Sequence, residues 1–378
     1  MKVLHTSDWH LGSTELDRSV GGDQFFFIEQ ICRIIQQEHV EAVLIAGDVF
    51  DRSVPPGEAI RLYDYAVTRI CRELGVPAML IAGNHDSAER LANCRELLSS
   101  AGLYVSGSIE REPMIVSLGD AEFFLLPWIT EEKVKSVYPE EKESVNSLED
   151  AYRVVAGRYR ERFSPGKRHI LIAHAFITNA ETSTSDRVAE IGFATQVPAS
   201  VFDGFDYVAL GHIHKPQDVT DTVSYSGTPM IYSFGKEEKQ EKSVTILDTA
   251  DMSRRRVPLP LLHRWTTVTG TLEEVLHPAL DEEAKNGYVR IRVTDSFLGL
   301  EALSELKRVY PNFVDGAGKT YDNDDSSVTM TLEELETVEN DPVAVFRYYC
   351  EEETDVQPDE HLISLFENAM KKAAEAEG

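Results

Sequence analysis

Five short segments of the chain carry aspartate, asparagine and histidine side chains of the kinds that bind metal ions. They are Asp8-Trp9-His10, Gly47-Asp48, Gly83-Asn84-His85-Asp86, His174 and Gly211-His212-Ile213-His214. Oxygen and imidazole ligands without thiolate favour divalent ions such as Mn²⁺, Fe²⁺ or Zn²⁺ over a structural site built from cysteines. Any single motif is weak, because a lone histidine after a strand is more often a hydrogen-bonded structural residue. Seven candidate ligands together are too many for one tetrahedral ion and predict a two-metal centre that shares one carboxylate.

Each of these segments follows a continuous apolar run, which is typical of a strand buried on both faces. The expected strands are 2–6, 42–46, 78–82, 169–173 and 207–210. Sites in open α/β sheets form beyond the carboxyl ends of strands. We therefore expect the five segments to meet in one crevice, although they lie far apart in the sequence.

The segments between the expected strands indicate the fold class. Apolar residues at three- and four-residue spacings predict helices at 23–39, 58–74 and 88–100. A hairpin at 114–126 and a further strand at 243–247 indicate a second sheet packed on the first. The expected fold is α/β, with two sheets flanked by helices.

The last third of the chain has a different pattern. Segment 288–294 alternates apolar and polar residues like a half-exposed strand, a helix is expected at 300–309, and a further strand at 328–332. These elements predict a small separate α+β unit. A helix pair at 341–372 then either folds back on its own domain or docks on a partner helix.

Charge and composition limit the possible functions. Of the 378 residues, 37 are Lys or Arg and 65 are Asp or Glu, giving a net charge of -28 that repels polyanions, so a phosphate substrate needs local cations. Two charge-rich stretches, 130–150 and 235–242, are expected to be solvated surface. The four cysteines form no CxxC pair, and no apolar run approaches the roughly 18 residues of a membrane span. We expect a cytoplasmic protein.

The order of the motifs resembles one known superfamily. The series Asp-x-His, Gly-Asp-x-x-Asp, Gly-Asn-His-Asp, His and Gly-His-x-His, over about residues 1–235, is similar to the calcineurin-like metallophosphoesterases. More narrowly, segments 5–12, 209–216 and 225–235 resemble the bacterial SbcD family of nuclease subunits, and a less specific similarity continues into the tail. The resemblance implies a two-sheet metallophosphoesterase sandwich, a small α+β capping domain and a C-terminal helix pair.

The resemblance also implies roles for individual residues. Two divalent ions, Mn²⁺ above all, would be bound by two overlapping ligand sets: Asp8, His10, Asp48 and His214, and Asp48, Asn84, His174 and His212. A water between the ions would attack phosphorus in line. His85 would stabilise the pentacovalent state and donate a proton to the leaving 3′ oxygen.

Several neighbouring residues have two possible roles. Asp51 either hydrogen-bonds to a histidine behind the ligands or is a simple turn residue, and Asp86 either supports the site or caps the helix that follows. Arg52, Arg90 and Lys215 are candidates for DNA phosphate contact, although a solvated surface role fits each equally well.

The implied substrate is DNA. The activities would be 3′→5′ exonuclease on double-stranded DNA and endonuclease on single-stranded or hairpin DNA, within a DNA repair complex. The partner would be an SbcC-type coiled-coil ATPase, with two copies of each subunit and therefore a homodimer. Residues 1–262 would form the nuclease domain, 263–335 the DNA-capping domain and 336–378 the partner-binding tail. A small-molecule phosphodiesterase or phosphatase would share the five motifs, and a metal-free interaction subunit is a further alternative.

Overall fold

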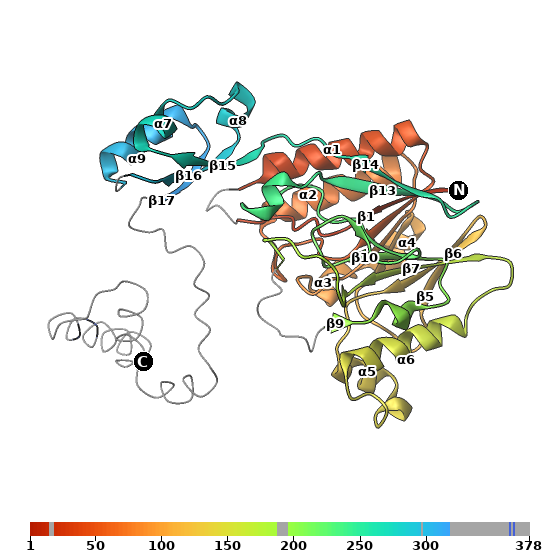
Figure 1. The fold of residues 1–378 in the computed structure, drawn as a ribbon. Coiled ribbons are helices and arrows are strands. Elements are labelled where there is room, and N and C mark those ends of the chain that lie inside the picture. Colours follow the sequence, from red (N-terminus) through yellow and green to blue (C-terminus); the bar gives the residue numbers. More distant parts are fainter. Residues whose placement is uncertain (15–18, 187–195, 296–297, 318–362, 364–365, 367–378) are drawn as a thin grey trace. The chain divides into compact units, whose positions relative to one another are not determined.

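The structure is a computed structural model that describes residues 1–14, 19–186, 196–295, 298–317, 363 and 366. Its first sheet contains four parallel strands, β1 (Lys2–Thr6), β2 (Ala42–Ala46), β3 (Ala78–Ile81) and β4 (Leu103–Ser106). Two antiparallel strands, β13 (Ser243–Asp248) and β14 (Arg254–Pro258), extend it on the β1 side. The strand order is β14-β13-β1-β2-β3-β4 (Figure 1).

A second six-stranded sheet packs against the first. Its central strands are the parallel β6 (Ala121–Leu126), β7 (Arg168–His174), β10 (Tyr207–Gly211) and β12 (Val223–Tyr225). The antiparallel strands β5 (Met114–Leu118) and β11 (Gln217–Asp218) form its edges, so that the order is β11-β12-β10-β7-β6-β5. A short separate pair is formed by β8 (Phe176–Ile177) and β9 (Gln196–Val197).

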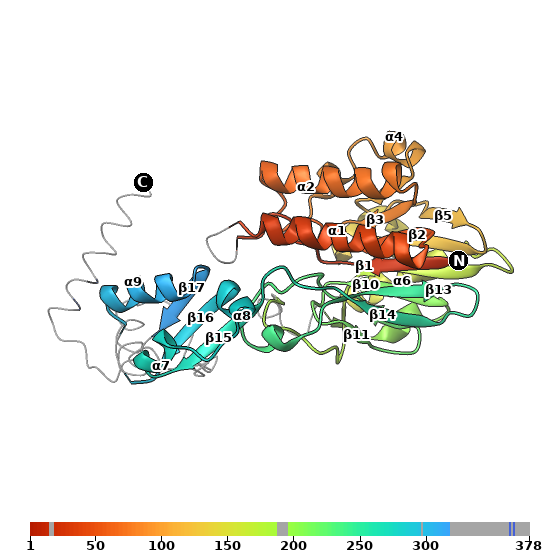
Figure 2. The same ribbon diagram turned by 90° about the horizontal axis from the view of Figure 1, so that it is seen from above.

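Helices cover the outer faces of both sheets. The first sheet carries α1 (Gly21–Glu38), α2 (Gly57–Val67), α3 (Ala88–Leu91) and α4 (Arg95–Ser100), and α2 continues as a π-helical segment over Thr68–Glu73. The second sheet carries α5 (Glu131–Val137) and α6 (Leu148–Arg160). Figure 1 shows α1 and α2 on one side of the sandwich and α6 on the other, and Figure 2 shows α1 and α2 side by side.

The apolar side chains of single strands divide between two cores. In β2, Val43 and Ile45 pack in the cluster that contains α1, whereas Leu44 packs with Phe123 and Ile170 between the two sheets. Both faces of the central strands are thus buried, which is why their sequences are continuously apolar. The architecture is four layers, helix, sheet, sheet and helix, and the predicted α/β two-sheet fold is confirmed.

Two predictions about the sheets need correction. The five strands with ligands at their ends do not share one sheet, because β1, β2 and β3 lie in the first and β7 and β10 in the second. The strand at 243–248 pairs with β1 in the first sheet instead of joining the hairpin in the second. The helix predicted at 88–100 is divided at Cys94, whose φ of 58° is left-handed.

The prediction that two charge-rich stretches are solvated surface holds for most of their residues but fails at a few. Within 130–150, Val134 and Val145 are fully buried, and the stretch contains α5 and the start of α6. Within 235–242, Glu237 is fully buried and Lys242 is 1% exposed. Charge content alone therefore does not place every residue of a segment in solvent, because a few buried side chains can pack the segment against the core.

The part of the chain after β14 forms a three-stranded sheet in the order β15 (Trp265–Gly270), β16 (Tyr288–Val293), β17 (Phe313–Ala317). Its helices are α7 (Leu272–Leu276), α8 (Glu282–Asn286) and α9 (Leu300–Val309), which confirms the strand and helix predicted at 288–294 and 300–309. The strand at 328–332 and the helix pair at 341–372 lie outside the described residues. The described helices include none with the length and apolar content of a membrane span.

The chain divides into two compact units. The first comprises Met1–Val268, Pro278–Arg290 and Leu306–Asp315 and holds both six-stranded sheets. The second includes Thr269–His277 and Ile291–Glu305. The functional boundaries expected at 262 and 335 stay a prediction.

Candidate metal centre

Six of the seven candidate ligands lie in loops at the carboxyl ends of four strands, and the seventh, His174, is the last residue of β7. Hydrogen bonds tie these loops together: the Asp8 N–H donates to the Gly47 carbonyl at 3.0 Å, and the His212 N–H donates to Asp8 Oδ1 at 2.9 Å. The second of these bonds joins a loop of the first sheet to a loop of the second. The centre is therefore built across the sandwich.

The backbone of this region is strained. Four of the seven residues have φ between 41° and 100°, in the left-handed region: Asp8, His10, Asp48 and His212. Such a conformation costs a non-glycine residue about 1–3 kcal/mol and persists only where the surrounding structure enforces it. Strain concentrated in this way at one place is characteristic of functional sites.

The glycines that precede the ligands allow the loops to approach closely. A Cβ at Gly83 would lie 2.1 Å from Asp48 Oδ1, and a Cβ at Gly211 would lie 1.9 Å from the Ala46 carbonyl oxygen. No side chain fits at either distance. The Gly-Asn-His-Asp and Gly-His-x-His motifs thus include their glycines for steric reasons.

We expect Gly83→Ala to displace the Asp48 loop, because the added methyl group meets the Asp48 carboxylate and main-chain nitrogen. Overpacking of this kind costs about 1–3 kcal/mol. The expected result is a lower melting temperature together with weaker Mn²⁺ binding, measured by thermal unfolding and calorimetric titration. Gly22→Ala is the matched control, since a Cβ at Gly22 in α1 meets nothing within 4 Å. Unchanged metal binding in Gly83→Ala would contradict the steric argument.

One half of the centre is formed by Asp8, His10, His214 and the Asp48 carboxylate. The Nε2 atoms of His10 and His214 are 3.1 Å apart, and His10 Nε2 is 3.9 Å from Asp48 Oδ2. Ligand atoms of Asp8, His10 and His214 lie within 4.8 Å of one another, and all three residues are buried. Two imidazole nitrogens that face each other at this distance need a proton or a cation between them.

The other half is formed by Asn84, His174 and His212, again beside Asp48. His174 Nδ1 donates to the Ala46 carbonyl at 2.9 Å, so in the neutral ring its Nε2 is an acceptor. That Nε2 faces Asp48 Oδ2 at 3.4 Å and Asn84 Oδ1 at 3.0 Å. His212 Nδ1 is also 3.0 Å from Asn84 Oδ1. The His174 nitrogen and the oxygens of Asp48 and Asn84 are thus three acceptors that face one another, which is the environment of a cation.

Ionisation of the buried groups supports the same conclusion. Burial raises the pKa of Asp8 to about 8 and lowers the pKa of His10 and His214 well below the usual range. Burial also lowers the pKa of His174, but the neighbouring Asp48 carboxylate outweighs it and raises the value to about 9. The protons that Asp8 and His174 retain occupy positions where metal ions would supply positive charge. The donor set of carboxylates, imidazoles and one amide fits a binuclear metal site.

His85 lies beside this donor set with a fixed orientation. Its Nδ1 donates to the main-chain carbonyl of Asp51 at 2.8 Å, and its Nε2 is 4.0 Å from Asp48 Oδ2. The ring packs edge-on against His10, with 4.9 Å between centroids. The main-chain carbonyl of Asp51 thus orients His85. The side-chain Oδ1 of Asp51 is 3.7 Å from Nδ1 of His10.

Of the two roles considered for Asp86, its contacts match support of the site and not capping of the helix that follows. Its carboxylate accepts main-chain N–H groups of Val49 at 3.1 Å, Phe50 at 2.9 Å and Gly83 at 2.9 Å. Ser87, at the start of α3, makes no side-chain capping bond. Asp86 therefore fastens the loop after β2 to the loop after β3, and burial raises its pKa to about 6.

The three candidate cations have unequal surroundings. Arg52 and Arg90 are exposed, and Arg52 Nη2 donates to Thr14 Oγ1 at 3.1 Å. Lys215 forms an ion pair with Glu181, which would compete with a phosphate group for its ammonium.

The sequence-based hypothesis missed residues that contact the ligands. Asp186 Oδ1 accepts the His214 N–H at 2.8 Å, and Ser185 Oγ is 2.6 Å from His214 Nδ1. The indole of Trp128 stacks on His212, with centroids 5.4 Å apart and planes at 23°. Trp128 follows the carboxyl end of β6, so the strand-end rule applied to that strand could have found it. The strand-end rule does not point to Asp186.

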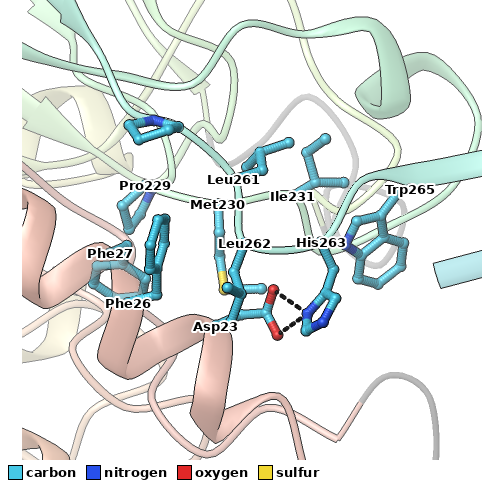
Figure 3. A pocket seen from close by; sticks show the side chains of 11 residues that line it. Asp23, Phe26, Phe27, Pro229, Met230, Ile231, Leu261, Leu262, His263 and Trp265 are labelled. Carbon is cyan, nitrogen blue, oxygen red and sulfur yellow. Dashed lines mark hydrogen bonds and ion pairs between the residues drawn. The ribbon is translucent and has the colours of Figure 1, made fainter. Parts of the chain in front are cut away.

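A separate pocket between α1 and segments 229–231 and 260–265 is lined by apolar side chains, and none of the seven candidate ligands is among them (Figure 3). Asp23 and His263 face each other in it, with 3.0 Å between Oδ2 and Nδ1. The Tyr288 hydroxyl donates to the same carboxylate at 2.9 Å. The Asp23–His263 pair thus anchors the segment after β14 on α1 and is not part of the metal centre.

Comparison with known proteins agrees with this geometry. The family model for calcineurin-like phosphoesterases matches residues 1–216. A protein of Staphylococcus epidermidis, named as the D component of the nuclease SbcCD, is 28% identical over 376 residues, covering 97% of this chain and 98% of the relative. A protein of the same name from Staphylococcus saprophyticus is 27% identical over 325 residues, covering 85% and 86%. The matched motifs lie on the Asp/His centre described above, and the chain belongs to the calcineurin-like phosphoesterase family, as a metal-dependent phosphoester hydrolase.

Proposed function

We propose that this chain is the nuclease subunit of an SbcC–SbcD-type DNA repair complex in the cytoplasm. It would act as a 3′→5′ exonuclease on double-stranded DNA and as an endonuclease on single-stranded or hairpin DNA. One observation carries the proposal: seven ligand-type side chains from five strand ends converge in two groups that meet at Asp48.

The proposed ligand sets follow these two groups. One Mn²⁺ ion would be held by Asp8, His10, Asp48 and His214, and the other by Asp48, Asn84, His174 and His212. Such a pair of ions supplies Lewis acidity and a water of lowered pKa for attack on a phosphodiester. The chain orients its donors rigidly, because the Ala46 carbonyl fixes His174 and Asp186 fixes the main chain of His214.

His85 would be the proton donor to the leaving oxygen. Its Nδ1–H is engaged by the Asp51 carbonyl, so Nε2 is the atom directed to the centre. An imidazole held in this way is the commonest general acid near neutral pH. Asp51 and Asp86 support the site through the main-chain contacts described above.

Two observations support DNA over a small-molecule phosphoester as the substrate. Similarity to a relative that is named as part of the nuclease SbcCD extends over 97% of the chain, well past the residues that the chemistry requires. The net charge of -28 is consistent with a protein that obtains much of its DNA affinity from metal ions and a partner. Arg52, Arg90 and Lys215 are the proposed phosphate contacts.

The remaining parts of the proposal concern assembly. Residues 263–335 would cap the DNA and residues 336–378 would bind a coiled-coil ATPase of the SbcC type, in a complex with two copies of each subunit. The helical pattern of the tail supports this assignment, as does the name of the relatives, which makes them one component of the nuclease SbcCD.

The decisive experiment compares substrates. Purified protein is incubated with end-labelled hairpin DNA, duplex DNA and a nitrophenyl phosphodiester, each with Mn²⁺, Mg²⁺ or a chelator. We expect Mn²⁺-dependent cleavage of both DNAs, with products shortened from the 3′ end of the duplex. Hydrolysis of the nitrophenyl ester without DNA cleavage would favour a small-molecule phosphodiesterase.

Deleting residues 336–378 is expected to abolish binding to the coiled-coil ATPase while leaving Mn²⁺-dependent cleavage by the isolated protein unchanged, because no proposed ligand lies in the tail. Co-purification and a hairpin-cleavage assay measure the two properties separately. Loss of intrinsic cleavage with partner binding retained would reverse the assignment.

A further inference from the structure

A buried ion pair lies directly behind one half of the metal centre. Lys242 and Glu237 are fully enclosed, with 2.5 Å between Nζ and Oε1. Lysine is almost never fully buried, and replacing a buried ion pair by neutral groups of similar volume is often neutral or stabilising. Global stability alone therefore does not explain the presence of this pair.

The Lys242 ammonium connects three further acceptors besides Glu237. It donates to Thr228 Oγ1 at 2.7 Å, to the His214 carbonyl at 3.3 Å and to Gln240 Oε1 at 3.3 Å. A lysine offers three N–H donors, which suits a position where several acceptors meet. A methionine of the same length would leave all of them without this donor.

These contacts belong to a closed ring of hydrogen bonds that includes the main-chain N–H and carbonyl of His214. From Lys242, hydrogen bonds run through Gln240, Ser183 and Asp186 to the His214 N–H, and the His214 carbonyl returns to Lys242. The Thr228 N–H donates to the same carbonyl at 3.1 Å. The main-chain N–H and the main-chain carbonyl of His214 are thus both held, and its Nε2 lies 3.1 Å from Nε2 of His10.

We propose that the Lys242–Glu237 pair is a positioning unit for His214, and that it sets the affinity of the metal site shared by His10 and His214. The inference rests on the proposed two-metal function. It predicts a selective effect, because the ring does not include Asn84, His174 or His212. Loss of the pair should weaken one ion and leave the other bound.

The test uses a neutral double variant, Lys242→Met with Glu237→Gln, so that no unpaired charge is left in the interior. Mn²⁺ binding to the metal-free full-length chain is titrated by electron paramagnetic resonance, which separates a single ion from a coupled pair. We expect the wild-type chain to bind two coupled ions. In the double variant, the affinity of one ion should fall about 10–100-fold, as is typical when a residue behind a metal ligand is lost, and the other should be unchanged.

Three further variants serve as controls for the metal-binding result. Arg153→Met with Glu149→Gln neutralises an exposed ion pair on α6 in an analogous way and should bind as the wild type does. His214→Ala should lose the same ion as the double variant. Thr228→Val removes one member of the cluster without changing any charge, and should weaken the same ion even if the double variant fails to fold.

Wild-type affinity for both ions in the folded double variant, or in Thr228→Val, together with loss of one ion in His214→Ala, would overturn the positioning role alone. A wild-type chain that binds fewer than two ions would overturn the proposed centre itself, and with it this inference.

Discussion

Replacing Asp48 by alanine is expected to remove both metal ions and all nuclease activity. The Asp48 Oδ2 atom lies 3.9 Å from His10 Nε2 and 3.4 Å from His174 Nε2, between the two halves of the centre. Loss of a residue behind a metal ligand typically costs about 10–100-fold in affinity or activity. Loss of a carboxylate shared by two ions should exceed that, and activity should fall to the level of chelator-treated protein. Anomalous scattering from crystals grown with Mn²⁺ measures occupancy directly.

Asp48→Asn is the control for structural damage. The amide keeps an oxygen that can accept the His85 N–H, which Asp48 Oδ1 accepts at 2.9 Å, but it lacks the negative charge. We expect Asp48→Asn to fold as the wild type does and to bind metal far more weakly. Retention of both ions in Asp48→Ala would disprove the bridging role.

His85→Asn is expected to lower DNA cleavage about 10²–10⁴-fold, the usual contribution of a general acid, while both ions stay bound. The reason is that His85 lies beside the ligands without belonging to either set, and its Nε2 faces the centre. The deficit should depend on the leaving group. A nitrophenolate leaves without protonation, so hydrolysis of a nitrophenyl phosphodiester should fall much less than cleavage of DNA, whose leaving group is an alcohol.

That contrast separates proton donation from a structural effect of the substitution, which would lower both reactions equally. His277→Asn makes the same change at an exposed histidine and should alter neither rate. Equal deficits with both substrates, or full activity on DNA, would remove His85 from the proton-transfer step.

Much of the fold could be predicted because the strong signals are local. The strands β1, β2 and β10 begin where the apolar runs begin, and α1 follows the helical spacing in the sequence. The partition of strands between sheets could not be predicted, since β3 and the middle of β7 are both continuous apolar runs that are buried on both faces. Which strand pairs with which is a matter of long-range packing, which apolar pattern does not encode.

The candidate ligands could be located because each follows a strand, but the groups that orient them could not. Asp186 contacts His214 from a segment that does not directly follow a strand. Its carboxylate stands out only because the side chain is 1% exposed and accepts the N–H groups of Ser183 and His214. Lys242 and Glu237 lie in a stretch whose charges suggest solvent. Their burial follows from the fold of the loops around His214, which the composition of the segment does not reveal.

The division of the centre between two sheets has a consequence for how the protein is made. Asp8, His10, Asp48 and Asn84 come from loops of the first sheet, whereas His174, His212 and His214 come from the second. A chain synthesised only as far as β4 therefore holds one of the four candidate imidazoles, that of His10, and neither sheet alone holds a complete proposed ligand set. Ions that bind donors from both sheets would stabilise the complete sandwich over any part of it. A partly made or cleaved copy is therefore expected to lack the proposed two-metal centre.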